Sequence, residues 1–193
     1  MNSAAKGAIA GFLLCLFATV SARVAAEDRM PVLEVESLSG EELKLPSDLA
    51  VGHALFIVGF SKASRSQTEE WSRRLSTVGQ ADTVAIYPVS ILEDAPRFIR
   101  PMIIRGIKKN VPEAHHERFL VATKQSQEWK SMTAYGEPDI AYLVLLNSQH
   151  QVIWRFQGAA DDSSIHELKK QLESEGRVEI TEPSTADEDP ASP

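Results

Sequence analysis

Two serines and two cations stand where an apolar segment gives way to a polar one. The apolar run at 54–60 leads straight into Ser61, Lys62, Ser64 and Arg65. Where a strand meets a helix, free backbone N–H groups and the helix dipole attract negative charge, and Lys62 and Arg65 would add to that attraction. The serines could instead cap the helix and leave both cations in solvent. The junction therefore predicts either a helix cap or a site for a small anion or an acidic peptide.

Serine catalysis is a weaker interpretation of Ser61. Hydrolases place a nucleophilic serine at a strand-to-helix elbow in the pattern Gly-x-Ser-x-Gly. Here Gly59 matches the first glycine, but Ala63 stands at the second glycine position. A serine nucleophile also needs a base, and no histidine stands in an obvious partner position. The sequence thus offers no complete catalytic constellation.

One short segment, Glu113-Ala114-His115-His116-Glu117, holds residue types that bind metals. Adjacent histidines diverge on a helix or a strand, and no second His or Cys group stands at a supporting spacing. We expect a solvated loop here, with no metal and no cofactor. The isolated histidines His53, His150 and His166 are expected at the surface.

Large aromatic side chains are expected to fill the core rather than a ligand pocket. This set comprises Trp71, Phe98, Trp129, Trp154 and Phe156. The run Met102-Ile103-Ile104 differs, because three large apolar residues in a row on one helix cannot all face the core. Surplus apolar area can mark a binding surface, so this run is a candidate interaction face.

Hydrophobic periodicity predicts the elements that position these residues. Strands are expected at 31–38, 43–46, 54–60, 83–90, 119–123, 142–146 and 152–156. Helices are expected at 64–78, 95–109, 125–132 and 163–173. Ser66-Gln67-Thr68-Glu69 has the pattern of a capping box, and Pro101 predicts a kink in the second helix or a later start. This order of elements predicts an α/β sandwich of three layers with a mixed central sheet.

The strand-to-helix junction resembles the active-site loop of the thioredoxin-like superfamily, in its redoxin branch. In that superfamily an aromatic residue, Cys-x-x-Cys and a basic residue follow the buried strand. Here Phe60 and Arg65 match, while Ser61 and Ser64 stand at the two cysteine positions. A thiol in this setting ionises and attacks disulfides, whereas a hydroxyl stays protonated. The resemblance, over 31–173, implies a thioredoxin-like α/β/α fold with an N-terminal β-hairpin and without redox chemistry.

A second feature of the superfamily is also replaced. Thioredoxin-like proteins carry a cis-proline before the penultimate strand, and its backbone pairs with extended substrates. Here Ala141 stands at that position, within Asp139-Ile140-Ala141-Tyr142. A cis peptide bond before a residue other than proline costs about 2.5–4 kcal/mol. We therefore expect a trans bond and a reshaped groove.

The hairpin at 141–158 resembles that of the mitochondrial ATP synthase assembly chaperone family and its bacterial relatives. Those proteins carry a Tyr-Val-x-Leu-x-Asp strand and an Arg-Trp-x-Gly turn. This chain has Asn147 at the aspartate position, and Trp154 and Arg155 stand in the opposite order. The resemblance implies a thioredoxin-like assembly factor that is poor in cysteine.

The first 26 residues have the layout of a signal peptide. Lys6 precedes an apolar run at 7–20, and Val24-Ala25-Ala26 offers the small residues that signal peptidase reads. We expect cleavage after Ala26 and a periplasmic or secreted protein, with an uncleaved inner-membrane anchor as the alternative. Cys15, the one cysteine of the chain, lies in this run, so the mature protein would hold none.

The predicted organisation is a signal peptide at 1–26, a thioredoxin-like domain at 27–176 and a disordered acidic tail at 177–193. The chain has a formal net charge of −7. Nucleic acid is a poor partner for such a surface, because phosphate binding needs a basic patch. Membrane contact is expected only through an uncleaved leader, and the oligomeric state stays open.

These features predict an exported, non-redox protein that binds an envelope protein as a folding or assembly factor. The expected site is the former substrate groove, formed by Phe60, Ser61, Lys62, Ser64, Arg65, Ala141 and Tyr142. An extended segment could add a strand there through backbone hydrogen bonds. Two alternatives stay open: a binding protein for a small anion or other ligand, and a redox enzyme of thioredoxin or peroxiredoxin type, which would need a thiol.

Overall fold

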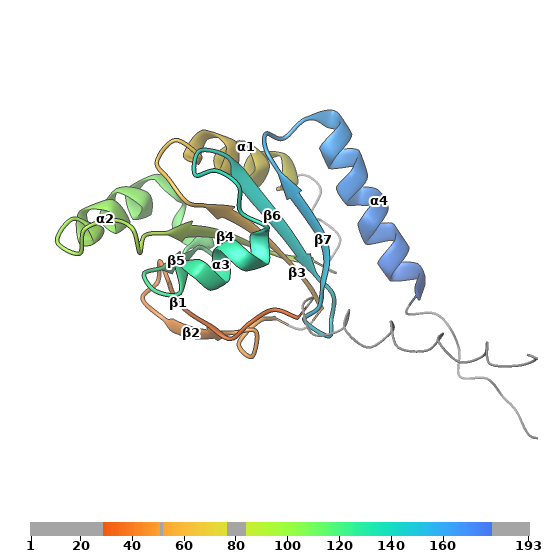
Figure 1. The fold of residues 1–193 in the computed structure, drawn as a ribbon, viewed down its shortest axis with the longest axis horizontal. Helices are drawn as coiled ribbons and strands as arrows, with labels where there is room; N and C mark the ends of the chain where they lie inside the picture. Colours follow the sequence, from red (N-terminus) through yellow and green to blue (C-terminus); the bar gives the residue numbers. More distant parts are fainter. Residues whose placement is uncertain (1–28, 51, 77–83, 179–193) are drawn as a thin grey trace, which may run out of the picture.

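The computed structural model describes residues 29–50, 52–76 and 84–178, which form one mixed sheet with helices on both faces (Figure 1). The predicted leader and the acidic residues from 179 onward lie outside this part of the chain. The strands are β1 (Leu33–Ser37), β2 (Glu42–Leu45), β3 (His53–Gly59), β4 (Val84–Ile91), β5 (Leu120–Ala122), β6 (Ala141–Leu146) and β7 (Val152–Gln157). The helices are α1 (Arg65–Leu75), α2 (Arg100–Asn110), the 3-10 turn η1 (Glu113–His115), α3 (Ser126–Thr133) and α4 (Asp162–Val178).

The strand order across the sheet is β2-β1-β5-β4-β3-β6-β7. The centre is parallel, because β3 pairs with β4 and β4 with β5 in the same direction. The strands β6 and β1 flank this centre in antiparallel pairing, and each forms a hairpin with its outer neighbour. All side chains of 54–58 and 141–146 are buried, since helices cover both faces there. The expected α/β/α sandwich with a mixed sheet and an N-terminal hairpin is therefore confirmed.

The alternation of side chains along the strands divides the core between the two faces. On one face, Phe56 of β3 and Leu120 of β5 pack with Trp129 of α3. On the other face, Leu55 packs with α1 and α4, and Val121 packs with α2. The strands β3, β4 and β5 follow one another in one direction across the sheet, so right-handed crossovers put α1 and α2 on the same face.

The starts of two helices differ from simple sequence patterns. The predicted capping box is wrong, because α1 begins at Arg65 and Ser66 therefore lies inside the helix. The Glu69 carboxylate binds the Arg65 guanidinium at 2.6 Å instead. The second helix takes the later start, since α2 begins at Arg100 with Pro101 in its first turn. Proline is tolerated there because that N–H would have no partner within the helix. The last helix runs to Val178, beyond the expected end at 173.

Two predicted burial states are wrong. Phe98, expected in the core, is 84% exposed, because it lies in the turn before α2 and the helix packs through Ile103, Ile104 and Ile107 instead. His116, expected in a solvated loop, is buried, and its Nε2 lies 2.9 Å from the Val111 carbonyl oxygen. The other aromatic residues of the expected core set, Trp71, Trp129, Trp154 and Phe156, do pack in the core.

The two phenylalanines Phe56 and Phe98 give a matched test of this core. Phe56 is fully buried, whereas the ring of Phe98 is in solvent. We expect Phe56→Ala to lower the free energy of unfolding by about 3–5 kcal/mol, because a large cavity opens. Phe98→Ala should change it by no more than about 0.5 kcal/mol. Urea unfolding followed by tryptophan fluorescence measures both, and equal losses would contradict this core.

An ion-pair network links α1 to α4. The carboxylate of Glu70 accepts hydrogen bonds from Arg73 and Arg74, and Arg74 also reaches Asp162 at the start of α4, at 2.8 Å. The hydrogen bond from Arg73, followed by that from Arg74, lowers the pKa of Glu70 from its ordinary value of 4.5 to about 2. The Glu70 side chain is 35% exposed, so solvent screens this network and its effect on stability is small.

The lowered pKa of Glu70 fixes the sign of a pH dependence. The unfolded chain takes up the proton first, so the stability from this pair is present above pH 4.5 and is lost as the pH falls toward about 2. The difference in unfolding free energy between wild type and Glu70→Gln should therefore shrink over this window. Urea titrations at several pH values measure it. A difference that stays constant from pH 7 down to about pH 2 would contradict this network.

Candidate functional site

The loop 61–64 between β3 and α1 is closed by its own serines. The Oγ of Ser61 accepts hydrogen bonds from the backbone N–H groups of Ala63 at 3.0 Å and Ser64 at 3.2 Å. The Ser64 hydroxyl is fully buried and donates to the Ser61 carbonyl oxygen at 2.9 Å. The loop therefore keeps a closed turn without sulfur at either position.

Gly59 makes room for this turn. A Cβ at Gly59 would lie 2.9 Å from the Ser64 Oγ and 3.3 Å from the Thr68 Cγ2. Both distances are shorter than ordinary van der Waals contact, so the close approach of β3 to the start of α1 needs a residue without a side chain.

Asp139 lies across the loop from Ser61. The Ser61 hydroxyl donates to the Asp139 Oδ1 at 2.8 Å, between residues 78 positions apart in the chain. A carboxylate beside the N-terminus of α1 is favoured by the helix dipole. The Asp139 carboxylate thus lies beside the helix start, where one interpretation of the sequence predicts a bound anion.

The two cations of the loop are placed differently. Arg65 binds Glu69 within α1, one turn further along. Lys62 is exposed, and the described residues hold no ion-pair partner for it. Lys62 is therefore the loop cation that is open to a partner.

The backbone of Ala141 is occupied within the chain. Its N–H donates to the Gln67 Oε1 at 3.0 Å, and its carbonyl oxygen accepts from the Gly158 N–H at 2.8 Å. The peptide bond before Ala141 is trans, as expected; the cis bond found in the described residues is Leu45–Pro46. An extended segment could pair with Ala141 only by displacing these hydrogen bonds.

Besides Ser64, three of the predicted site residues are buried: Phe60, Ala141 and Tyr142. The ring of Phe60 meets the rings of Tyr135 and Tyr142 edge to face, at centroid distances of 4.8 and 5.4 Å. The Tyr142 hydroxyl accepts the backbone N–H of Glu137 and donates to the carbonyl oxygen of the same residue. These residues therefore support the neighbouring loop from beneath and do not face solvent.

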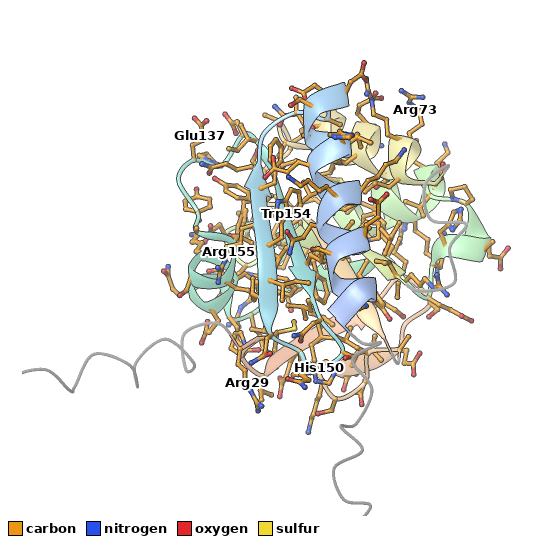
Figure 2. All side chains as sticks on the ribbon, turned by 90° about the vertical axis from the view of Figure 1, so that its right-hand side faces the viewer. Arg29, Arg73, Glu137, His150, Trp154 and Arg155 are labelled. Carbon is orange, nitrogen blue, oxygen red and sulfur yellow. The ribbon has the colours of Figure 1, made fainter. Side chains whose placement is uncertain are left out.

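The solvent-facing part of the site consists of two loops, which we name the two-loop surface. The first loop exposes Lys62 and Ala63, with Arg65 beside them at the start of α1, and the second loop exposes Glu137, Pro138 and Asp139. Figure 2 shows Glu137 at one end of the domain, on the loop that leads into β6. The Ser61–Asp139 hydrogen bond joins the two loops.

Sequence reasoning missed two residues of this site. Asp139 precedes Ala141 by two positions in the stretch that replaces the cis-proline, and this closeness was a usable signal. Gln67 was assigned to a capping box, whereas its side chain holds the start of β6. Both contacts join segments far apart in the chain, so local spacing alone did not reveal them.

Trp154 and Arg155 of the hairpin face opposite sides of the sheet (Figure 2). The Trp154 Nε1 donates to the Glu167 Oε1 of α4 at 3.3 Å. The Arg155 Nε donates to the Met132 carbonyl oxygen near the end of α3 at 2.8 Å. The order of these two residues thus decides which helix each one holds.

Neither a metal centre nor a spanning helix is found in the described part of the chain. No three His, Cys, Asp or Glu side chains gather there in an arrangement that could hold a metal ion. Of the helices in the same part, none has both the length and the apolar character needed to cross a bilayer.

The fold is thioredoxin-like. A protein from Aquifex aeolicus VF5 that is proposed to act in electron transfer matches with a TM-score of 0.57 and 12% identity, over 81% of this chain and 99% of its own. The pneumococcal exposed lipoprotein thioredoxin from Streptococcus pneumoniae strain TIGR4 matches at 0.54 and 11%, over 74% and 99%. BsSco, of the Sco family of cytochrome c oxidase assembly proteins, matches at 0.53 and 14%, over 76% and 94%. No protein-family model and no curated protein matches the chain.

If the loop keeps thioredoxin geometry, cysteines at its two serine positions should form a disulfide. We expect Ser61→Cys with Ser64→Cys, in a Cys15→Ser background, to lose both free thiols on mild oxidation, as measured by thiol titration. Ser61→Cys with Ser76→Cys is the control, because the length of α1 separates these positions too far for a bridge. Two free thiols in both variants would contradict the assignment of the loop.

Proposed function

We propose that this chain is an exported thioredoxin-like protein without redox activity, which binds an envelope protein and assists its folding or assembly. The observation that carries the proposal is the Ser61 hydroxyl, which uses its one donor and both acceptor lone pairs within the chain. An oxygen at this position neither ionises at neutral pH nor forms a disulfide. The loop is therefore suited to present a surface and not to exchange electrons.

The occupied helix start favours a protein partner over a small anion. An anion at the N-terminus of a helix needs free backbone N–H groups. In the first turn of α1, the N–H groups of Arg65 and Gln67 bind the carbonyl oxygens of Lys62 and Ser64. Just before the helix, the N–H groups of Ala63 and Ser64 bind the Ser61 Oγ, and Asp139 supplies a carboxylate beside them. A further free anion would meet that carboxylate as a like charge.

The two-loop surface suits docking through side chains. Lys62 lies on one loop and Glu137 and Asp139 on the other, so both signs of charge are offered side by side. Strand addition at Ala141 is less favourable, because it would break the hydrogen bonds to Gln67 and Gly158. We therefore propose that the partner contacts the exposed loop side chains.

Fold analogy adds support to the assembly role. BsSco, which shares this fold, belongs to a family of cytochrome c oxidase assembly proteins. The hairpin at 141–158 resembles that of ATP synthase assembly chaperones. Fold alone does not fix function, so the analogy adds to the argument from Ser61 and does not replace it.

The proposal is tested by crosslinking and pull-down from the native envelope, with Ala63→Arg as the site variant. Ala63 is exposed on the first loop, so a long charged side chain there should block a partner without disturbing the core. Ala50→Arg is the control, at an exposed position before the opposite end of β3. We expect one abundant envelope protein to be captured by wild type and control and to be lost with Ala63→Arg. The same captured proteins with both variants would show that the two-loop surface is not the site.

The redox alternative makes the opposite prediction for turnover. We expect the cleaved chain to reduce neither insulin disulfides nor peroxide, because it would contain no thiol. A standard turbidity assay with insulin and a peroxide-consumption assay measure this. Turnover of either substrate by a preparation whose mass shows cleavage after Ala26 would contradict the non-redox proposal.

A further inference from the structure

The helix α2 is basic in an acidic protein. The segment 95–112 holds Arg97, Arg100, Arg105, Lys108 and Lys109 and no acidic residue, although the whole chain has a net charge of −7. Arg100 serves the fold, because its guanidinium binds the carbonyl oxygens of Glu93 and Ala95 before the helix and of Thr123 after β5. The other four cations are exposed, and no ion pair within the described residues engages them.

Large apolar side chains share the solvent side of this helix with the cations. Phe98 is 84% exposed and Met102 is 68% exposed. Within α2, Met102, Arg105 and Lys109 follow one another at steps of three and four residues, which places them on one side of the helix, and Phe98 is exposed in the turn just before it. The opposite side packs on the sheet through Ile103, Ile104 and Ile107. We name the outward set of Phe98, Met102, Arg105 and Lys109 the α2 face.

Helix stability accounts for only part of this pattern. Cations in the last turn, such as Lys109, complement the helix dipole. The dipole gives no reason for Arg105 in the middle of the helix. It also gives no reason for two large apolar side chains in solvent, where each loses the stabilisation of burial.

We propose that the α2 face binds the surface of an anionic lipid bilayer. Phe98 and Met102 lie at the boundary between headgroups and acyl chains, and Arg105 and Lys109 contact lipid phosphates. This contact is independent of the two-loop surface and of the proposed function. It is a contact of the folded domain, separate from the uncleaved leader that the sequence leaves as the alternative to cleavage after Ala26.

The size and position of the α2 face favour a bilayer over an acidic protein. A stable protein interface buries about 800 Å² per partner and involves roughly 20–30 residues a side. Here one helix and the turn before it expose only two large apolar residues, among lysines and arginines. Figure 1 shows α2 projecting at one end of the domain, far from α4, where a flat surface can approach it.

The test is co-sedimentation of the full chain with vesicles of phosphatidylcholine alone and with about 30% phosphatidylglycerol. The apolar run at 7–20 is present in every variant, so the readout is the gain in affinity from the anionic lipid. We expect Arg105→Gln with Lys109→Gln to weaken binding to anionic vesicles about 25-fold, at about 5-fold per cation. Phe98→Ser with Met102→Ser should weaken it about 10-fold, with an unchanged circular dichroism spectrum.

A matched variant removes the same charge elsewhere. Lys169→Gln with Lys170→Gln takes two exposed cations from α4 and should leave binding to anionic vesicles within about twofold of wild type. An equal loss in this control would overturn the proposal, because net charge and not the α2 face would then govern binding. So would a gain from anionic lipid that the α2 variants leave unchanged.

An environment-sensitive dye gives a local readout. In a Cys15→Ser background, a dye on Phe98→Cys should shift to the blue with phosphatidylglycerol vesicles and not with phosphatidylcholine vesicles. A dye on His166→Cys of α4 should not shift with either. No shift at position 98 would overturn the proposal. Binding of polyglutamate without binding of anionic vesicles would also overturn it, and would point to an acidic protein instead.

Discussion

The antiparallel pairing of β3 with β6 places Gly59 opposite Ala141, and this register decides which loops meet at the end of the sheet. Both strands are apolar on both faces, so a slip by one residue would leave the ladder buried but would misalign the ends. In the observed register the Ser61 hydroxyl reaches the Asp139 carboxylate, and the Gln67 side chain reaches the Ala141 N–H. The shape of the two-loop surface follows from this one alignment.

The loop between β3 and α1 is held closed by hydroxyl hydrogen bonds. The Ser61 oxygen accepts hydrogen bonds from two backbone N–H groups of the loop, and its hydroxyl donates one to the Asp139 carboxylate. With one hydrogen bond donated and two accepted, the Ser61 hydroxyl has no lone pair left for a ligand.

The two candidate surfaces lie at the same end of the sheet. Because β3 and β4 are parallel, the loop after β3 and the turn before α2 both follow the carboxyl ends of their strands. A bilayer contact through the α2 face would therefore hold the two-loop surface near the membrane, within reach of an envelope protein. The two proposals are independent in their evidence, but this geometry makes them compatible.

Local sequence patterns were enough to predict the order of elements, the strands covered on both faces and the serines at the loop. Continuous apolar runs and helical spacing predict the elements from neighbouring residues alone. The absence of thiols from the predicted mature chain follows from the composition. Only the tertiary structure decided that Phe98 is exposed, that His116 is buried and that Ala141 has no free backbone group. Phe98 lies outside the core because α2 begins only at Arg100. The Ala141 N–H binds Gln67, 74 positions away in the chain, and the Ser61 hydroxyl binds Asp139, 78 positions away. Periodicity tells which side of an element faces the core, but the partners of a polar side chain depend on which distant segments the sheet brings together.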